Sequence, residues 1–139
     1  MIDPRIQAVF DRWAAQEMVT RGNIVHTVAM FTADSVPGPL NKPVVSWKIR
    51  AWRRRALIFG ARYKGRDYFP AFQFRLGEPK PIVQQILCLV KPSDDWHAMF
   101  WFVGTNVWLD GIASPYEVMD LDPDQVLEAA SHANDQVSD

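Results

Sequence analysis

Two motifs near the carboxyl terminus constrain the fold more tightly than any other feature of the 139-residue sequence. Residues 114–117 read SPYE and residues 122–125 read DPDQ, so each motif places a capping residue before a proline and ends on Glu or Gln. The capping side chain satisfies a free backbone N–H, and proline at the first helical position has no N–H to satisfy. Each motif therefore predicts the start of a helix.

Apolar residues in the rest of the chain recur mainly at intervals of three and four, the spacing of one helix face. The first helix is predicted from about Pro4 to Thr20, with Gly22 and Asn23 ending it. Its apolar stripe contains Ile6, Val9, Phe10, Trp13, Ala14 and Met18. Further helices are predicted over residues 24–31, from Asn41 or Lys42 to near Ala56, over residues 82–90, and from Asp94 to Val103 with Ser93 as the cap.

The helix predicted over residues 94–103 is apolar around most of its circumference, which predicts a central place in the packing. A β-hairpin is predicted where aromatic runs bracket Lys64 and Gly65. Pro70 cannot donate a ladder hydrogen bond, so the second strand is expected to be irregular or at a sheet edge. The expected fold is mainly helical with one small hairpin, in which modules 1–75 and 76–139 share a core. Ser131 to Asp139 are expected to form a loose tail.

The net charge of −1 conceals two oppositely charged segments. Residues 42–75 contain ten bases and one acid, for a net charge of +9, whereas residues 76–139 contain two bases and eleven acids, for a net charge of −9. A positive field of this density suits a polyanion. Carboxylates repel nucleic acid and suit a basic protein surface. The two segments therefore predict two different partners.

The basic segment resembles a winged helix-turn-helix in layout, which predicts binding to double-stranded DNA. A basic helix would enter the major groove and the following hairpin would contact the backbone. Charge alone does not exclude RNA, on which Trp47 and Trp52 would stack, but their spacing with Val45 and Ile49 favours burial. A solvated charged face without a ligand is a further reading. The residues predicted to contact DNA are Lys48, Arg50, Arg53, Arg54, Arg55, Arg62, Lys64 and Arg66.

The second half of the chain carries a recognisable series of motifs. YFPAFQF occupies residues 68–74, WLDG residues 108–111, and SP with DPDQVLEAA residues 114–115 and 122–130. In this order they resemble the toxin-binding region of Xre/MbcA/ParS-type antitoxins, over about Tyr68 to Ala130. The amino-terminal part does not look like a typical Xre-type helix-turn-helix.

The resemblance implies an antitoxin of a type II toxin–antitoxin pair. Such a protein binds a RES-domain toxin, closes the toxin's NAD-consuming active site, binds its own promoter, and assembles as a homodimer or hetero-oligomer. It is not itself an enzyme. The stretch Val126 to Asp139 is the expected blocking segment. The residues that we predict to bind the toxin are Trp108, Leu109, Asp110, Pro115, Val126, Leu127, His132 and Asn134.

Catalytic chemistry is not predicted. His26, His97 and His132 lie far apart in the sequence, and the chain has no Cys/His cluster, P-loop or GxGxxG motif. We therefore expect no enzyme activity, metal or cofactor. Cys88 lies in an apolar run and is predicted to be a buried thiol. Without a signal-peptide pattern or an apolar run of about 20 residues, the expected location is cytoplasmic, with no membrane partner.

Two alternatives stand beside the antitoxin hypothesis. One is a stand-alone DNA-binding transcriptional regulator whose helical half only mediates dimerisation. The other is a small hydrolase or transferase whose catalytic residues form no recognisable motif. A neighbouring gene for a RES-type toxin would favour the antitoxin, whereas a solitary gene whose product binds DNA but neutralises no toxin would favour the regulator.

Overall fold

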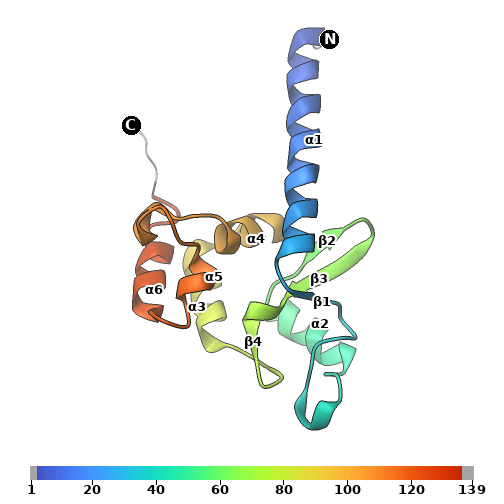
Figure 1. Ribbon diagram of the computed structural model, residues 1–139, viewed down its shortest axis with the longest axis vertical. Helices are drawn as coiled ribbons and strands as arrows, with labels where there is room; N and C mark the ends of the chain where they lie inside the picture. The colour runs from blue at the N-terminus through green and yellow to red at the C-terminus, as the bar shows by residue number, and fades with distance from the viewer. Residues whose placement is uncertain (1–2, 136–139) are drawn as a thin grey trace.

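The computed structural model describes residues 3–135 (Figure 1). Its α-helices are α1 (Pro4–Thr27), α2 (Ser46–Arg54), α3 (Pro81–Val90), α4 (Asp95–Val103), α5 (Pro115–Val118) and α6 (Pro123–Ser131). Its strands are β1 (Met30–Phe31), β2 (Ala61–Tyr63), β3 (Arg66–Pro70), β4 (Phe74–Arg75) and β5 (Glu78–Pro79). Short 3-10 helices occupy Pro39–Asn41, Ala71–Gln73 and Val107–Leu109. The prediction of a mainly helical fold with a small antiparallel β element is confirmed.

The amino-terminal half is built around a three-stranded antiparallel sheet of order β1-β3-β2. Phe31 lies opposite Phe69 on one side of β3, and Ala61 lies opposite Tyr68 on the other. The β2–β3 turn at Lys64 and Gly65 confirms the predicted hairpin. One face of α2 packs with this sheet into a buried apolar cluster. Its members are Val36, Val44, Ile49, Trp52, Ile58 and Phe69.

The carboxyl-terminal half is a group of short helices, α3 to α6, in which α4 lies in the core. Trp96, Met99 and Phe102 of α4 are all buried, as its apolar circumference predicts. α3 packs along α6, and α5 packs against α4. The same core reaches into the first half, because the ring of Phe59 stacks on that of Phe102 with centroids 4.9 Å apart. The two halves therefore share one core.

Both helix-start motifs form the caps that the sequence predicts. Ser114 and Glu117 make a reciprocal capping box, and the Asp122 carboxylate accepts a hydrogen bond from the Gln125 N–H at 3.2 Å. The Ser114 hydroxyl and N–H both donate to the Glu117 carboxylate, which lowers the pKa of Glu117 below its ordinary value. Local chemistry therefore fixes where α5 and α6 begin.

The first helix is longer than predicted. α1 passes Gly22 and continues to Thr27, so residues 24–31 do not form a second helix and end instead in strand β1. Glycine costs a helix only about 1 kcal/mol relative to alanine, which is too little to end it. Gly22 is also packed, since a Cβ there would lie 2.6 Å from the Tyr63 hydroxyl. The glycine thus marks the point where α1 meets the sheet.

The helix predicted from Asn41 or Lys42 begins at Ser46 instead. The preceding chain is held in an extended conformation, because the Val44 N–H donates to the Val36 carbonyl at 2.8 Å. This bond and the burial of both valines outweigh the local preference for a proline-started helix. The prediction at this start was therefore wrong.

Two further local predictions are corrected. Asp94, and not Ser93, caps α4 by accepting the His97 N–H at 2.8 Å. Pro70 lies in the central strand β3 and not in an edge strand. It is the last residue of β3 and is followed directly by a 3-10 helix, so its missing N–H falls where the strand ends.

Four side chains are oriented differently from the prediction. Cys88 is exposed, because α3 turns Val83, Ile86, Leu87 and Val90 to the core. Trp52 is buried as expected, but Trp47 is 63% exposed and Val45 is also exposed. Met18 lies about 140° around α1 from Trp13, so it is not part of the apolar stripe.

Within residues 3–135 no helix combines the length and apolarity that a membrane crossing needs.

Candidate functional site

The structure places a polar cleft between α2 and the β2–β3 hairpin. This basic cleft has a volume of about 550 Å³. Arg50 reaches it from α2, and Arg62 and Arg66 reach it from the two strands of the hairpin. Its lining is completed by Thr32, Ala33, Asp34, Ser46, Gly65 and Asp67. Three guanidinium groups from separate strands and a helix thus converge on one concave surface.

Two carboxylates limit the positive charge of the basic cleft. Asp67 pairs with Arg53 at 3.6 Å. Asp34 accepts a hydrogen bond from the Thr32 hydroxyl at 2.7 Å. That bond, the bond from its own backbone and the attraction of Arg66 lower the pKa of Asp34. The cleft therefore keeps one more cation than it has anions at neutral pH.

Arg53 has a structural environment that sets it apart from the other predicted DNA contacts. Its guanidinium lies 2.6 Å from the Asp95 carboxylate of α4 and 3.6 Å from Asp67 of the hairpin. It also lies over the ring of Phe69 and donates to the Gly60 carbonyl at 3.5 Å. Arg53 thus ties α2 to both the hairpin and α4, and a ligand would have to displace these bonds to engage it.

The other predicted DNA-binding residues are exposed on α2 and the hairpin. Trp47, Arg50 and Arg54 follow one another at helical spacing, so they share one outer face of α2. Within residues 3–135, Arg53 is the one member of the predicted set that forms an ion pair. The remaining members are Lys48, Arg50, Arg54, Arg55, Arg62, Lys64 and Arg66.

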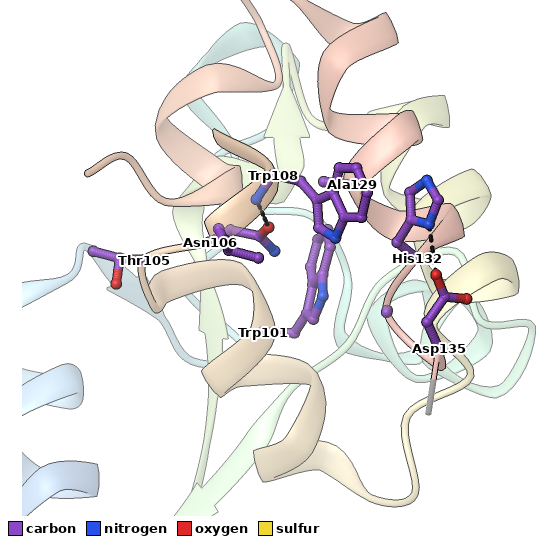
Figure 2. Close-up of a pocket in the computed structure, with 9 residues that line it drawn as sticks. Trp101, Thr105, Asn106, Trp108, Ala129, His132 and Asp135 are labelled. Carbon is purple, nitrogen blue, oxygen red and sulfur yellow. Dashed lines mark hydrogen bonds and ion pairs between the residues drawn. The ribbon is translucent and has the colours of Figure 1, made fainter. Parts of the chain in front are cut away.

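A second concave surface lies in the carboxyl-terminal half. This aromatic hollow has a volume of about 670 Å³ and lies between α4, the 3-10 helix at 107–109 and the end of α6 (Figure 2). The Trp108 indole stacks on the His132 imidazole, with ring centroids 3.8 Å apart and planes 10° from parallel. The lining residues are Trp101, Thr105, Asn106, Val107, Trp108, Ala129, His132, Ala133 and Asp135.

The His132 imidazole is held by two carboxylates as well as by the indole. Its Nδ1 lies 2.6 Å from Asp135, and its Nε2 lies 3.4 Å from Glu128 (Figure 2 shows the first contact). The hydrogen bond with Asp135 raises the pKa of His132 above its ordinary value, with a further contribution from Glu128. A protonated imidazole over an indole face also gains a cation–π attraction.

The eight residues assigned to toxin binding divide by exposure. Trp108, Asp110 and Asn134 are exposed, and Leu127 and His132 are half-buried. Leu109, Pro115 and Val126 are buried in the core, where a partner cannot touch them without opening the fold. A partner can therefore directly reach only the exposed and half-buried members of the set.

Asn134 also has a structural role. Its side-chain amide donates to the carbonyls of Leu89 and Val90, at 3.2 and 2.8 Å. Both carbonyls belong to the last turn of α3, and the residue after this turn, Lys91, has a left-handed backbone conformation. The segment that follows α6 is thus fastened back onto α3 as far as residue 135, whereas residues 136–139 of the predicted tail lie outside the described residues.

Seven residues of the aromatic hollow were not predicted as site residues: Trp101, Thr105, Asn106, Val107, Ala129, Ala133 and Asp135. Asn106 could have been found from the sequence, because an Asn two residues before Trp108 is a typical cap, and its side chain accepts the Trp108 N–H at 2.9 Å. No group of three metal-binding side chains comes together in the part of the chain that the structure describes.

Comparison with known proteins gives no match to any protein-family model, curated protein or solved structure.

Proposed function

We propose that this chain is an antitoxin that binds its own promoter through the basic cleft and a RES-type toxin through the surface around the aromatic hollow. The observation that carries the proposal is the placement of the two charge types. Apart from Arg53, the predicted DNA-binding residues form no ion pairs with the acidic half within residues 3–135. The positive field of α2 and the hairpin therefore stays available to a polyanion.

The DNA part of the proposal takes α2 as the recognition helix and the β2–β3 hairpin as the wing. α2 packs on the hairpin through Ile49 and Trp52, so helix and hairpin hold a fixed relative position. Arg50, on the outer face of α2, has the fork geometry that binds guanine edges or phosphates. Arg62 and Arg66, on the hairpin, would contact backbone phosphates beside it.

The DNA part is tested by fluorescence anisotropy with duplex DNA from upstream of the gene, over a range of salt concentrations. The double variant Arg50→Ala with Arg66→Ala is expected to bind at least about tenfold more weakly and to reduce the salt slope by about two. The control Arg12→Ala with Lys91→Ala removes the same charge elsewhere and should keep both values. Equal losses in the two double variants would contradict the proposal.

The toxin part rests on the family resemblance and on the shape of the aromatic hollow. Exposed aromatic groups in a concave surface are typical anchors of protein interfaces, and Trp108 is 47% exposed there. Acidic side chains beside the hollow favour a partner surface that is basic. Asp135 lines the hollow, Glu128 contacts His132, and Asp110 follows the 3-10 helix at 107–109. The hollow lies away from the basic cleft, so one chain can hold both partners.

The toxin part is tested by co-expression with the adjacent gene, followed by co-purification and measurement of cellular NAD. Wild-type protein should co-purify with the toxin and preserve NAD. Trp108→Ala should lose both effects, whereas the control Leu121→Ala, which truncates another exposed apolar side chain of the same half, should lose neither. Co-purification of the Trp108 variant at the wild-type level would contradict the assignment of the hollow.

A stand-alone transcriptional regulator is the second candidate, and the basic cleft favours it equally. Its helical half would then serve only for assembly. Binding to the upstream DNA in the anisotropy experiment, without toxin capture in the co-expression experiment, would select this candidate.

A further inference from the structure

The amino-terminal part of α1 extends away from the body of the protein (Figure 1). The first buried residues of the helix are Gly22 and Ile24, and every side chain from Pro4 to Thr20 is exposed except the half-buried Val9. These 17 residues span about 25 Å at the rise of an α-helix. Only the last two turns of α1 are therefore held by the rest of the fold.

An apolar stripe runs along this free part of α1. Ile6, Phe10 and Trp13 are 52, 50 and 63% exposed, and with Val9 they lie on one face. Phe10 and Trp13 contact each other edge to face, with ring centroids 5.9 Å apart. A shallow groove of about 580 Å³ follows the stripe. Ile24 lies on the same face of α1 and is buried, so the free stripe continues a face that the body already covers further along.

The free part of α1 is stabilised when another apolar surface packs on this stripe. In proteins most helical stability comes from packing of the apolar face and not from the helix propensity of its residues. An exposed aromatic patch of this kind is typical of an interaction surface. Within residues 3–135 no other segment covers it.

The charges beside the stripe indicate which kind of partner packs on it. Arg5 and Arg12 balance Asp11 and Glu17, so residues 4–20 carry no net charge and have both signs interspersed. A neutral surface has little attraction for a polyanion, and it does not repel a copy of itself. A Phe or Trp side chain buries about 150–250 Å² in full, and about half of that area remains for a partner to cover at Phe10 and Trp13. Two such stripes face to face therefore bury less than the roughly 1,200 Å² of a standard interface, which is typical of a weak, concentration-dependent dimer.

We propose that the chain forms a homodimer in which the free part of α1 packs along the same part of α1 in a second copy. Ile6, Val9, Phe10 and Trp13 of each copy form the apolar seam. None of the residues that line the basic cleft or the aromatic hollow belongs to this seam.

The test is the molar mass of the full-length protein, measured by sedimentation equilibrium over a concentration series. The mass of the wild type is expected to rise from the 15.9 kDa of one chain toward twice that value as the concentration increases. Trp13→Glu and, separately, Phe10→Glu are expected to give the single-chain mass at all concentrations. Both sites are exposed and lie outside the buried core, so the body should keep its thermal transition in each variant.

Ala15→Glu is the matched control, because Ala15 lies on the opposite face of α1 and the substitution adds the same charge to the same helix. It should remain dimeric. The proposal is overturned by a wild-type protein that stays monomeric, by a dimer that survives Trp13→Glu, or by equal dissociation of Ala15→Glu. It is also overturned if the isolated protein is monomeric and amides 4–20 gain exchange protection only with a co-purified toxin. The mass measurements use the protein alone, so their outcome is independent of the DNA and toxin experiments.

Discussion

The side-chain amide of Gln73 forms two hydrogen bonds with the backbone of Phe59. The Phe59 N–H donates to Oε1 at 2.7 Å, and Nε2 donates to the Phe59 carbonyl at 2.8 Å. Nε2 also donates to the Pro70 carbonyl at 3.3 Å. Gln73 is fully buried and acts as a substitute strand partner for residue 59. The glutamine of the FPAFQF motif therefore has a structural role.

Replacing Gln73 should therefore destabilise the fold strongly. Gln73→Leu leaves a buried N–H and a buried carbonyl without partners, and the expected loss is about 2–4 kcal/mol in the free energy of unfolding. Urea denaturation followed by tryptophan fluorescence measures it. Gln85→Leu, at an exposed position of α3, is the control and should change the stability by less than about 0.5 kcal/mol. Similar losses at both positions would refute the role of Gln73.

Arg53 and Arg54 are adjacent but should have separable effects. Arg53→Ala breaks the contacts with Asp67 and Asp95 and should lower the free energy of unfolding by about 1 kcal/mol, because the pairs are partly exposed. Arg54→Ala should leave stability unchanged and weaken binding to duplex DNA, because its side chain is exposed on the outer face of α2. Thermal denaturation and anisotropy on both variants would show this, and the reverse pattern would contradict it.

The contacts of His132 predict a dependence of stability on pH. Its pKa in the folded protein is raised above the ordinary 6.5, mainly by Asp135. The stabilisation is therefore complete below pH 6.5 and is lost as the pH rises through the raised pKa. The melting temperature of wild type should fall slightly over this window relative to that of His132→Gln. An NMR titration of the imidazole that gave a value below 6.5 would refute the prediction.

The amide of Asn134 should stabilise the end of α3. Asn134→Ala removes two donors from the carbonyls of Leu89 and Val90, and the expected loss is about 1 kcal/mol. Faster amide exchange in the last turn of α3 would locate the effect. Ser131→Ala, close by on α6, keeps these two bonds and serves as the control. Unchanged stability of the Asn134 variant would show that water replaces the amide without cost.

Features set by neighbouring residues were predictable from the sequence. The starts of α5 and α6 depend on side chains within three residues of the helix end, and the central position of α4 follows from its own composition. Features set by distant residues were not predictable. Residues 30–31 form a strand only because β3, almost forty residues later, pairs with them.

The candidate surfaces follow the same division. The basic segment was visible as a count of charges, but the sequence did not show that Arg53 would pair with Asp95 of α4. The stack of Trp108 on His132 depends on how α6 packs against the 3-10 helix at 107–109. The outward orientation of Trp47 could have been predicted from the sequence, because Trp47 lies about 140° around the helix from Trp52 and about 160° from Ile49.

The stack of Phe59 on Phe102 makes each half of the chain depend on the other half for its folding. A polypeptide cut after residue 75 would leave Phe59 and Ala61 without the aromatic layer that α4 supplies, and the remaining piece would lose the same contacts. The two proposed binding surfaces are therefore separable by point substitution but not by truncation. Recombinant fragments that carry either half alone should be insoluble or unfolded.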